Sequence, residues 1–338
     1  MSEKDSEYAP LGCLFKMTLI ASLLTSAGII LAQQIGKQRP TANIFAAIIQ
    51  RNRDHPGLVL RDMEGGTELT IARPKPGAFA WISPYDMLVR TEGTDKITQF
   101  NWRTLQRSDY SGIIPAADTD ETLTYSVFSQ GPDFSLFQQG KRIADFPGRL
   151  TDISWKDENF LAIYDGMDQL QHLGFYSKEG RKISEYNGTL GKSIQRPAWS
   201  ADGTRASFLE FDFVAGLWKL KQVSVSDAVV SDIRIPGFTV APATPSWGAG
   251  DKLAVLVNSG TSVYTKAGVV DLNANTFTLL QPNRGSDEYE QSISADGKYV
   301  AFIQQDGAEI DLVVTDTNGV VQQRYPYNFQ GNFSFRPR

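Results

Sequence analysis

Residues 197–203 read Pro-Ala-Trp-Ser-Ala-Asp-Gly and lead directly into an apolar stretch at 205–211. Two further copies of this unit, at 245–251 and 292–297, are followed in the same way by apolar residues. The small and acidic residues that end each copy are typical of a tight turn, and the apolar residues that follow are typical of a β-strand. The unit therefore predicts the turn between two antiparallel strands, repeated along the chain.

Fainter copies of the unit occur at 81–86 and 153–157, and the weakest surrounds 115–120. The units recur roughly every 35 to 50 residues, which is the length of a four-stranded propeller blade. The pattern predicts an all-β fold, a single β-propeller. One large apolar residue in the unit is expected to pack between neighbouring blades. These blade-core positions are Trp155, Trp199, Trp247 and Ile293.

Seven blades are expected between residue 43 and the end of the chain, with six as the alternative if the weak unit near Pro115 belongs to a neighbouring blade. Residues 44–49 begin like the second strand of a blade and lack the preceding motif. Residues 332–337 look like a first strand without a blade of its own. Pairing the two segments would close the ring and remove an exposed edge strand.

The repeated unit resembles the WD40-like (PD40) repeat of TolB-family propellers. The resemblance lies in the motif, in the apolar strand that follows it, and in turns such as that at 312–319. The resemblance runs from about Asn43 onward and is strongest in the last three repeats. It implies a β-propeller and, by analogy with TolB, protein partners at the bacterial envelope. The propellers of prolyl-oligopeptidase relatives share such repeats, so the motif specifies the fold better than the function. An apolar segment stands where TolB has its amino-terminal α/β domain.

That apolar segment predicts a transmembrane helix at 11–32, about the length that crosses a bilayer. It follows a short tail at 1–10 and precedes a polar linker at 33–42, so that the propeller occupies 43–338. A cleaved signal peptide ending at Ile30-Leu31-Ala32 is the alternative. The acidic residues of the tail favour a retained signal-anchor, because a signal peptide begins with a basic region.

Small and hydroxyl residues recur at helical spacing along the predicted membrane helix, and such stripes let helices approach closely in lipid. The residues of this packing face are Thr18, Ser22, Ser26, Ala21, Thr25 and Gly28. Our hypothesis is that this face contacts the transmembrane helices of a larger complex. A generic signal-anchor that happens to be rich in small residues is the alternative.

The composition argues against several functions. A net charge of −5 with no basic run argues against nucleic acid as a partner. No Gly-x-Ser-x-Gly pentapeptide occurs, and the chain has only two histidines, His55 and His172, which are expected at a turn and at the start of a strand. No catalytic, cofactor-binding or metal-binding residues are predicted. The acidic run at 286–290 either places carboxylates at the mouth of the central channel or forms a solvated loop.

These observations predict a non-enzymatic, membrane-anchored propeller that acts as a protein-binding scaffold or accessory subunit of a membrane complex. The expected partners are the lipid bilayer and other membrane or envelope proteins, which would bind the transmembrane helix and the propeller loops. The expected location is the bacterial inner membrane, single-pass, with the propeller in the periplasm. The alternative is a secreted or anchored propeller enzyme or ligand-binding protein with a site in the central channel.

Overall fold

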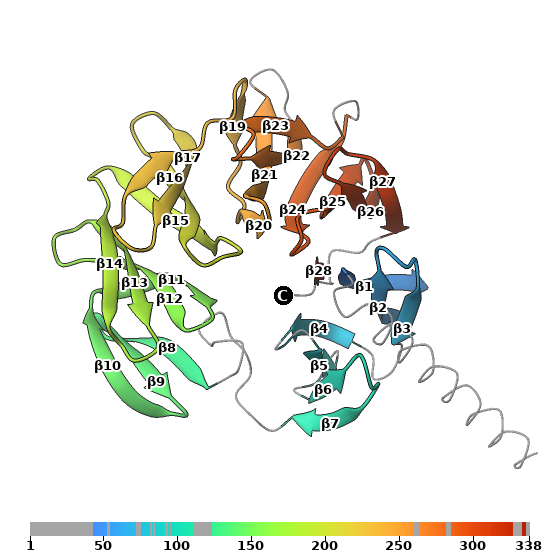
Figure 1. Cartoon of the computed structure of the whole chain (residues 1–338), viewed down its shortest axis with the longest axis horizontal. Coiled ribbons are helices and arrows are strands. Elements are labelled where there is room, and N and C mark those ends of the chain that lie inside the picture. Colours follow the sequence, from blue (N-terminus) through green and yellow to red (C-terminus); the bar gives the residue numbers. More distant parts are fainter. Residues whose placement is uncertain are drawn as a thin grey trace, which may run out of the picture.

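The computed structural model describes residues 43–52, 55–71, 76–81, 83, 85–91, 94, 96–110, 124–259, 264–281, 285–326 and 333–335. In this part of the chain, seven antiparallel sheets surround a common centre as the blades of a propeller (Figure 1). The predicted all-β propeller with seven blades is thereby confirmed, and the six-bladed alternative is wrong. The segment near Pro115 lies outside the described residues.

We number the blades in chain order. Blade 1 contains β28 (Phe333–Phe335), β1 (Ile44–Asn52), β2 (His55–Asp62) and β3 (Glu68–Ile71); blade 2 contains β4 (Pro76–Trp81), β5 (Asp86–Thr91), β6 (Ile97–Asn101) and β7 (Arg107–Tyr110); blade 3 contains β8 (Tyr125–Gln130), β9 (Asp133–Gln138) and β10 (Lys141–Pro147). Blade 4 contains β11 (Arg149–Lys156), β12 (Asn159–Asp165), β13 (Gln171–Ser177) and β14 (Lys182–Asn187); blade 5 contains β15 (Lys192–Trp199), β16 (Arg205–Asp212), β17 (Leu217–Ser224) and β18 (Val230–Asp232). Blade 6 contains β19 (Phe238–Val240), β20 (Ser246–Gly248), β21 (Lys252–Ser259), β22 (Thr265–Asp271) and β23 (Thr276–Leu279); blade 7 contains β24 (Asp287–Ile293), β25 (Tyr299–Asp306), β26 (Glu309–Asp316) and β27 (Val321–Pro326).

The second strand of a blade is buried on both faces. In β12 the run from Phe160 to Ile163 is fully buried, and in β25 the run from Val300 to Ile303 is nearly so. Where a blade has a packed neighbour on both sides, one side of it packs on the preceding blade and the other side on the following blade. These strands are therefore continuously apolar at their centres, unlike a strand with one face in water.

Apolar side chains fill the spaces between blades. Six core clusters each join one pair of neighbours: blades 7 and 1, 1 and 2, 3 and 4, 4 and 5, 5 and 6, and 6 and 7. Among the described residues, no such cluster joins blade 2 to blade 3. The connection between those blades, 111–123, lies outside the described part of the chain.

The last strand completes the first blade. β28 pairs antiparallel with β1, with Phe335 opposite Phe45 and Phe333 opposite Ala47. The ring of Phe45 lies 5.2 Å from that of Phe335 and 6.3 Å from that of Phe333. The sequence led us to expect a first strand at 332–337 for this blade, and the structure describes 333–335 in that place.

Two of the blade-core residues reach across to the preceding blade. The Trp199 indole N–H donates to the Ser154 carbonyl at 3.0 Å, and the Trp247 indole N–H donates to the Ser207 hydroxyl at 2.8 Å. Ile293 is buried between blades 6 and 7. Trp155 packs on Phe160, but its indole N–H is buried without an acceptor among the described residues.

The Asp-Gly turns follow the expected local chemistry. Asp202 accepts hydrogen bonds from the Ser200 hydroxyl and the Thr204 amide, so its carboxylate is used within the turn. Gly297 has a φ of +73°, and a Cβ there would lie 2.5 Å from the Ala249 carbonyl oxygen of blade 6. Only glycine fits this position.

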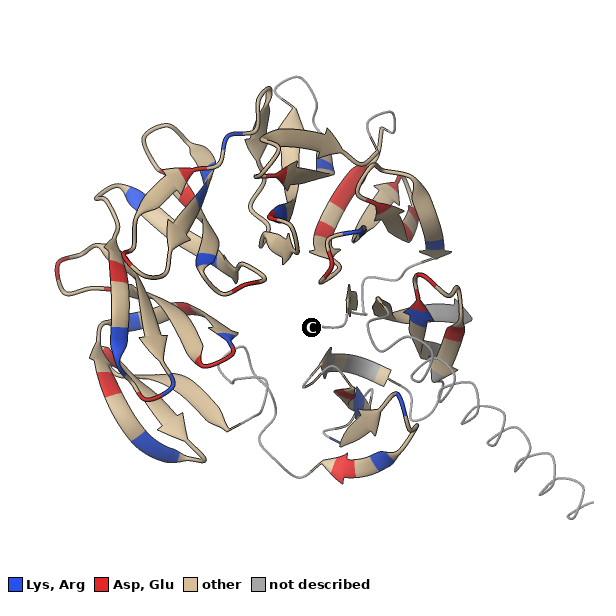
Figure 2. Ribbon diagram, in the orientation of Figure 1, with Lys and Arg blue, Asp and Glu red and all other residues tan. Residues whose placement is uncertain are grey.

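The two faces of the ring carry different connections. We call the side with the Asp-Gly turns the motif face. Asn43, where the described chain begins, lies on this side, since its side-chain amide donates to Asp296. We call the opposite side, with the β12–β13 and β16–β17 turns, the hairpin face. Basic and acidic residues are interspersed around the ring on all the blades (Figure 2).

The predicted membrane helix at 11–32 and its packing face lie outside the described residues. In the part of the chain that the structure describes, no helix has the length and apolarity to cross a bilayer.

Candidate functional site in the central channel

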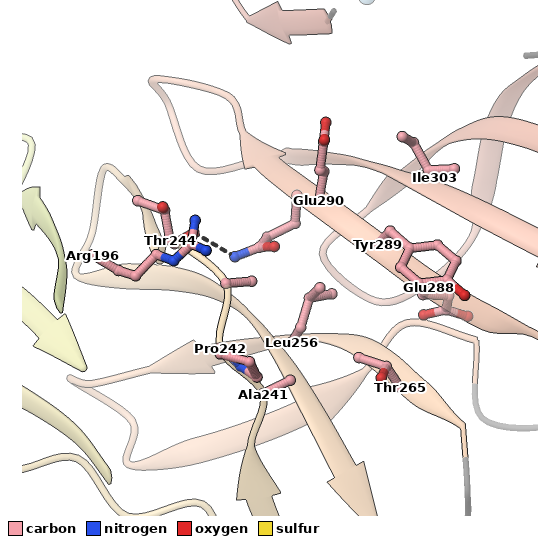
Figure 3. Close-up of a pocket in the computed structure, with 12 residues that line it drawn as sticks. Arg196, Ala241, Pro242, Thr244, Leu256, Thr265, Glu288, Tyr289, Glu290 and Ile303 are labelled. Atoms are coloured by element: carbon pink, nitrogen blue, oxygen red, sulfur yellow. Dashed lines mark hydrogen bonds between the residues drawn. The ribbon is translucent and has the colours of Figure 1, made fainter. Parts of the chain in front are cut away.

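Two neighbouring cavities lie along the inner strands of blades 4 to 7. The larger, of about 670 Å³, is lined from blades 5, 6 and 7, and the smaller, of about 510 Å³, from blades 4, 5 and 6. Both are lined by Arg196 of β15 and by Thr244, between β19 and β20. Figure 3 shows Arg196 on one side of the larger cavity and Glu288, Tyr289 and Glu290 of β24 on the other.

Two residues of this site have an unusual backbone conformation. Nine described residues other than glycine have a positive φ, and seven of these lie in the connections between strands. The other two are Arg196, with a φ of 58°, and Glu290, with a φ of 43°. Each lies inside an inner strand where the pairing with the next strand shifts by a bulge. A bulge of this kind redirects a side chain, and a left-handed residue with a large side chain is strained.

Arg196 is exposed in the channel. Its main-chain amide donates to the Asp152 carboxylate of β11 at 3.3 Å, which links blade 5 to blade 4. The guanidinium forms no ion pair within the described part of the chain. Burial raises the pKa of the Asp152 carboxyl, although hydrogen bonds from the Ile153 and Arg196 amides and the positive charge of Arg196 act in the opposite direction. The smaller cavity thus combines an exposed guanidinium with a nearby carboxyl that ionises less readily than usual.

Glu290 is also exposed, and no ion pair holds its carboxylate among the residues described. The next residue, Gln291, fixes the bulge, because its side-chain amide donates to the Thr244 carbonyl at 2.6 Å. The side-chain oxygen of Gln291 is buried and accepts no hydrogen bond in the described structure. Gln291 therefore acts in the wall of the larger cavity as a donor.

A buried ion pair supports the cavity from behind. Glu288 is fully buried, accepts a hydrogen bond from the Ala267 amide at 2.6 Å and lies 3.5 Å from the Lys266 ammonium. Lys266 also donates to the Ser286 carbonyl at 2.6 Å. Burial raises the pKa of Glu288 to about 6, even though these hydrogen bonds and Lys266 favour the ionised form. The pair joins blade 6 to blade 7 at the edge of the cavity.

His172 lies at the start of a strand, as predicted, as the second residue of β13, and is buried in blade 4. One ring nitrogen lies 2.9 Å from Asp168 and the other 2.9 Å from Asn187. Burial lowers the pKa of His172, but the hydrogen bonds to Asp168 and Asn187 outweigh burial and raise it. Since both nitrogens face acceptors, the histidine holds the β12–β13 turn against β14. His55, expected at a turn, is the first residue of β2.

The sequence did not single out Arg196 or Asp152, because nothing in a linear pattern marks a bulge. One signal did exist: the acidic run at 286–290 forms the start of β24, and Glu288 and Glu290 from it line the larger cavity. Among the described residues, no group of three or more histidine, cysteine and carboxylate side chains is placed to hold a metal ion.

No protein-family model matches this sequence, and no curated protein matches it either. Several solved structures are similar. A puromycin-hydrolysing peptidase from Mycobacterium tuberculosis shares 12 % identity with a TM-score of 0.56; the match covers 85 % of this chain and 52 % of the peptidase. An oligogalacturonate lyase from Vibrio parahaemolyticus shares 12 % identity with a TM-score of 0.53, over 77 % of this chain and 83 % of the lyase.

TolB from Acinetobacter baumannii is also similar, at 15 % identity and a TM-score of 0.48, over 92 % of this chain and 72 % of TolB. Such propellers occur in enzymes and in TolB alike, so the likeness concerns the fold. The chain is a seven-bladed β-propeller, and its sequence repeats resemble those of TolB-like propellers.

Proposed function

We propose that this protein is a membrane-anchored β-propeller that binds other proteins, as a scaffold or accessory subunit of a membrane complex. Residues 11–32 would hold it in the bacterial inner membrane, and the propeller would lie in the periplasm. The observation that carries the protein-binding role is a set of exposed apolar side chains on the hairpin face.

These side chains belong to three connections of blades 4 and 5. Met167 is 91 % exposed, Leu190 77 %, Phe213 63 % and Val214 94 %. Two of the connections contact each other, since the Phe213 amide donates to the Gly191 carbonyl at 3.1 Å. The Gly188 amide donates to the carbonyl of Gln171, which follows the third connection directly, at 2.8 Å. We call these four residues the hairpin patch. Neighbouring apolar side chains on a soluble surface are typical of protein interfaces.

The position of Asn43 relates this patch to the proposed anchor. The described chain begins on the motif face, so the linker at 33–42 would leave the propeller from the side opposite the hairpin patch. A propeller held in this way turns its patch away from the bilayer. A protein partner therefore fits the patch better than lipid does.

The test uses the full chain, extracted in mild detergent, with co-purifying proteins identified by mass spectrometry. A variant with Leu190→Ser, Phe213→Ser and Val214→Ser should lose its specific partners while its thermal midpoint stays close to that of the wild type. The matched control carries Val320→Ser and Val321→Ser, which alter residues 58 % and 42 % exposed on blade 7. Equal recovery of every partner with both variants would refute this role for the patch.

The anchor is tested separately. Alkaline extraction should leave the protein in the membrane fraction, and amino-terminal sequencing should find the segment at 11–32 retained. A mature protein beginning after Ala32 would instead establish the cleaved signal peptide. If the proposed face of the helix packs against partner helices, the double variant Ser22→Leu, Ser26→Leu should reduce the recovery of membrane partners.

The channel cavities favour a second candidate, a ligand-binding or enzymatic propeller. A site of this type combines a pocket with a few convergent polar groups and a carboxyl of altered pKa, and the larger cavity has these features in Arg196, Glu290 and Glu288. A small molecule that binds stoichiometrically in the channel and raises the thermal midpoint would support this alternative.

A further inference from the structure

We infer that the central channel takes a bipolar peptide segment, with an acidic group bound by Arg196 and a basic group bound by Glu290. This inference deepens the proposed protein-binding function by naming the chemistry of a second contact, away from the hairpin patch.

The first step is the backbone. Arg196 and Glu290 are the two described residues other than glycine that have a positive φ within a strand. Inner strands β4 and β11 also contain bulges, but no described residue other than glycine in those strands has a positive φ. A bulge alone therefore does not require this conformation. Within the described strands, this strained conformation is found only at two charged residues, and both line the larger cavity.

The second step is the charges. Arg196 and Glu290 have opposite signs and come from blades 5 and 7, on two sides of one cavity of about 670 Å³ (Figure 3). Among the described residues they form no ion pair, either with each other or with a third residue, although the charge of Arg196 acts on the Asp152 carboxyl. The Gln291 amide bonds to the Thr244 carbonyl within the same wall and fixes the bulge that carries Glu290. Two opposite charges held apart across a cavity are complementary to a ligand that carries both signs.

The third step is the class of ligand. Guanidinium binds carboxylate in two parallel hydrogen bonds, and a carboxylate binds ammonium or guanidinium. The smaller cavity, which Arg196 also lines, adds room for the peptide main chain. A peptide with an acidic and a basic side chain a few residues apart supplies both charged groups.

The probes are labelled peptides, acetyl-Asp-(Ala)n-Lys-amide with n from one to four, and neutral counterparts with Asn and Gln. Binding to the full chain in detergent is measured by fluorescence anisotropy. We expect one spacing to bind at least about tenfold more tightly than its neutral counterpart. Arg196→Gln and Glu290→Gln should each remove that preference, and Arg196→Lys should retain part of it. The control variants Arg234→Gln and Glu309→Gln, which alter exposed charges outside the larger cavity, should not change it.

The variants Arg196→Glu and Glu290→Lys, combined in one chain, should prefer acetyl-Lys-(Ala)n-Asp-amide, which carries its charges in the reverse order. The inference is overturned if no spacing is preferred over the neutral peptides, or if neither single variant changes the preference. Partner recovery through the hairpin patch would then still support the scaffold role. Charge-dependent peptide binding without any patch-dependent partner would instead uphold this inference and leave the scaffold role unsupported.

Discussion

The side-chain amide of Asn43 donates a hydrogen bond of 2.7 Å to the carboxylate of Asp296, 253 residues further along the chain. Asn43 precedes the first blade and Asp296 lies in the Asp-Gly turn of the last blade. The turn motif therefore also serves to join the two ends of the ring. Lys298 adds to this junction by pairing with Glu64 of blade 1 at 2.9 Å.

Asn43→Ala should lower the free energy of unfolding by about 1 kcal/mol, since the lost bond reaches a charged but partly exposed carboxylate. Burial raises the pKa of Asp296, but hydrogen bonds from Asn43, Ser294 and Lys298 outweigh it and hold that pKa below its usual value. A lowered carboxyl pKa stabilises the fold above the unfolded-state value and ceases to do so as the pH falls through the folded-state value. The difference in the free energy of unfolding between Asn43→Ala and the wild type should therefore be smaller at pH 3 than at pH 7. Denaturation at both pH values measures it. Asn318→Ala, an exposed change on blade 7, is the control.

Trp247→Phe should destabilise the propeller by about 2 kcal/mol more than Trp155→Phe does. The first variant loses a hydrogen bond and leaves the fully buried Ser207 hydroxyl without its donor. The second removes an indole N–H that has no acceptor among the described residues. A double-mutant cycle of Trp247→Phe and Ser207→Ala, measured by urea denaturation, gives the coupling energy between the two side chains. This coupling energy should account for most of the difference between the two tryptophan variants. Equal losses for the two tryptophans would contradict the role of this contact between blades.

The buried carboxyl of Glu288 should make stability depend on pH between about 4.5 and 6. Its folded-state pKa is raised to about 6, so the native state binds the proton more tightly than the unfolded chain does. Stability due to this group therefore falls as the pH rises through this window, by about 2 kcal/mol in total. Glu288→Gln should remove that fall. Urea midpoints at half-unit steps of pH would measure it, and an unchanged pH profile in the variant would contradict the prediction.

Arg196→Gly should be more stable than Arg196→Ala by about 1 kcal/mol, because glycine adopts a φ of 58° without strain. For the same reason, the Glu290→Gly variant should be more stable than the Glu290→Ala variant. Thermal unfolding of the four variants gives the comparison. If the alanine variants are as stable as the glycine variants, the left-handed conformation costs nothing, and the strain argument for the channel site loses its basis.

The hydrogen bonds of individual residues show why some features were predictable. Asp202 bonds to Ser200 and Thr204 within five residues of sequence, so the residue types alone indicate the turn. The repeat of such turns, each followed by an apolar strand, predicted the propeller and seven blades. Trp199 and Trp247 stood out for the same reason, as large residues at one place in a repeated unit.

By itself, the sequence determined that seven similar sheets would form, because turn chemistry and strand patterning act between neighbouring residues. The sequence also predicted that β28 would close the ring on β1, but only the tertiary structure decided two other relationships: Asn43 bonds to Asp296, and Arg196 and Glu290 line one cavity. Both relationships join residues from different blades, and the second depends on bulges that shift the strand register. Such features arise from the closing of the ring as a whole, and no local pattern encodes them.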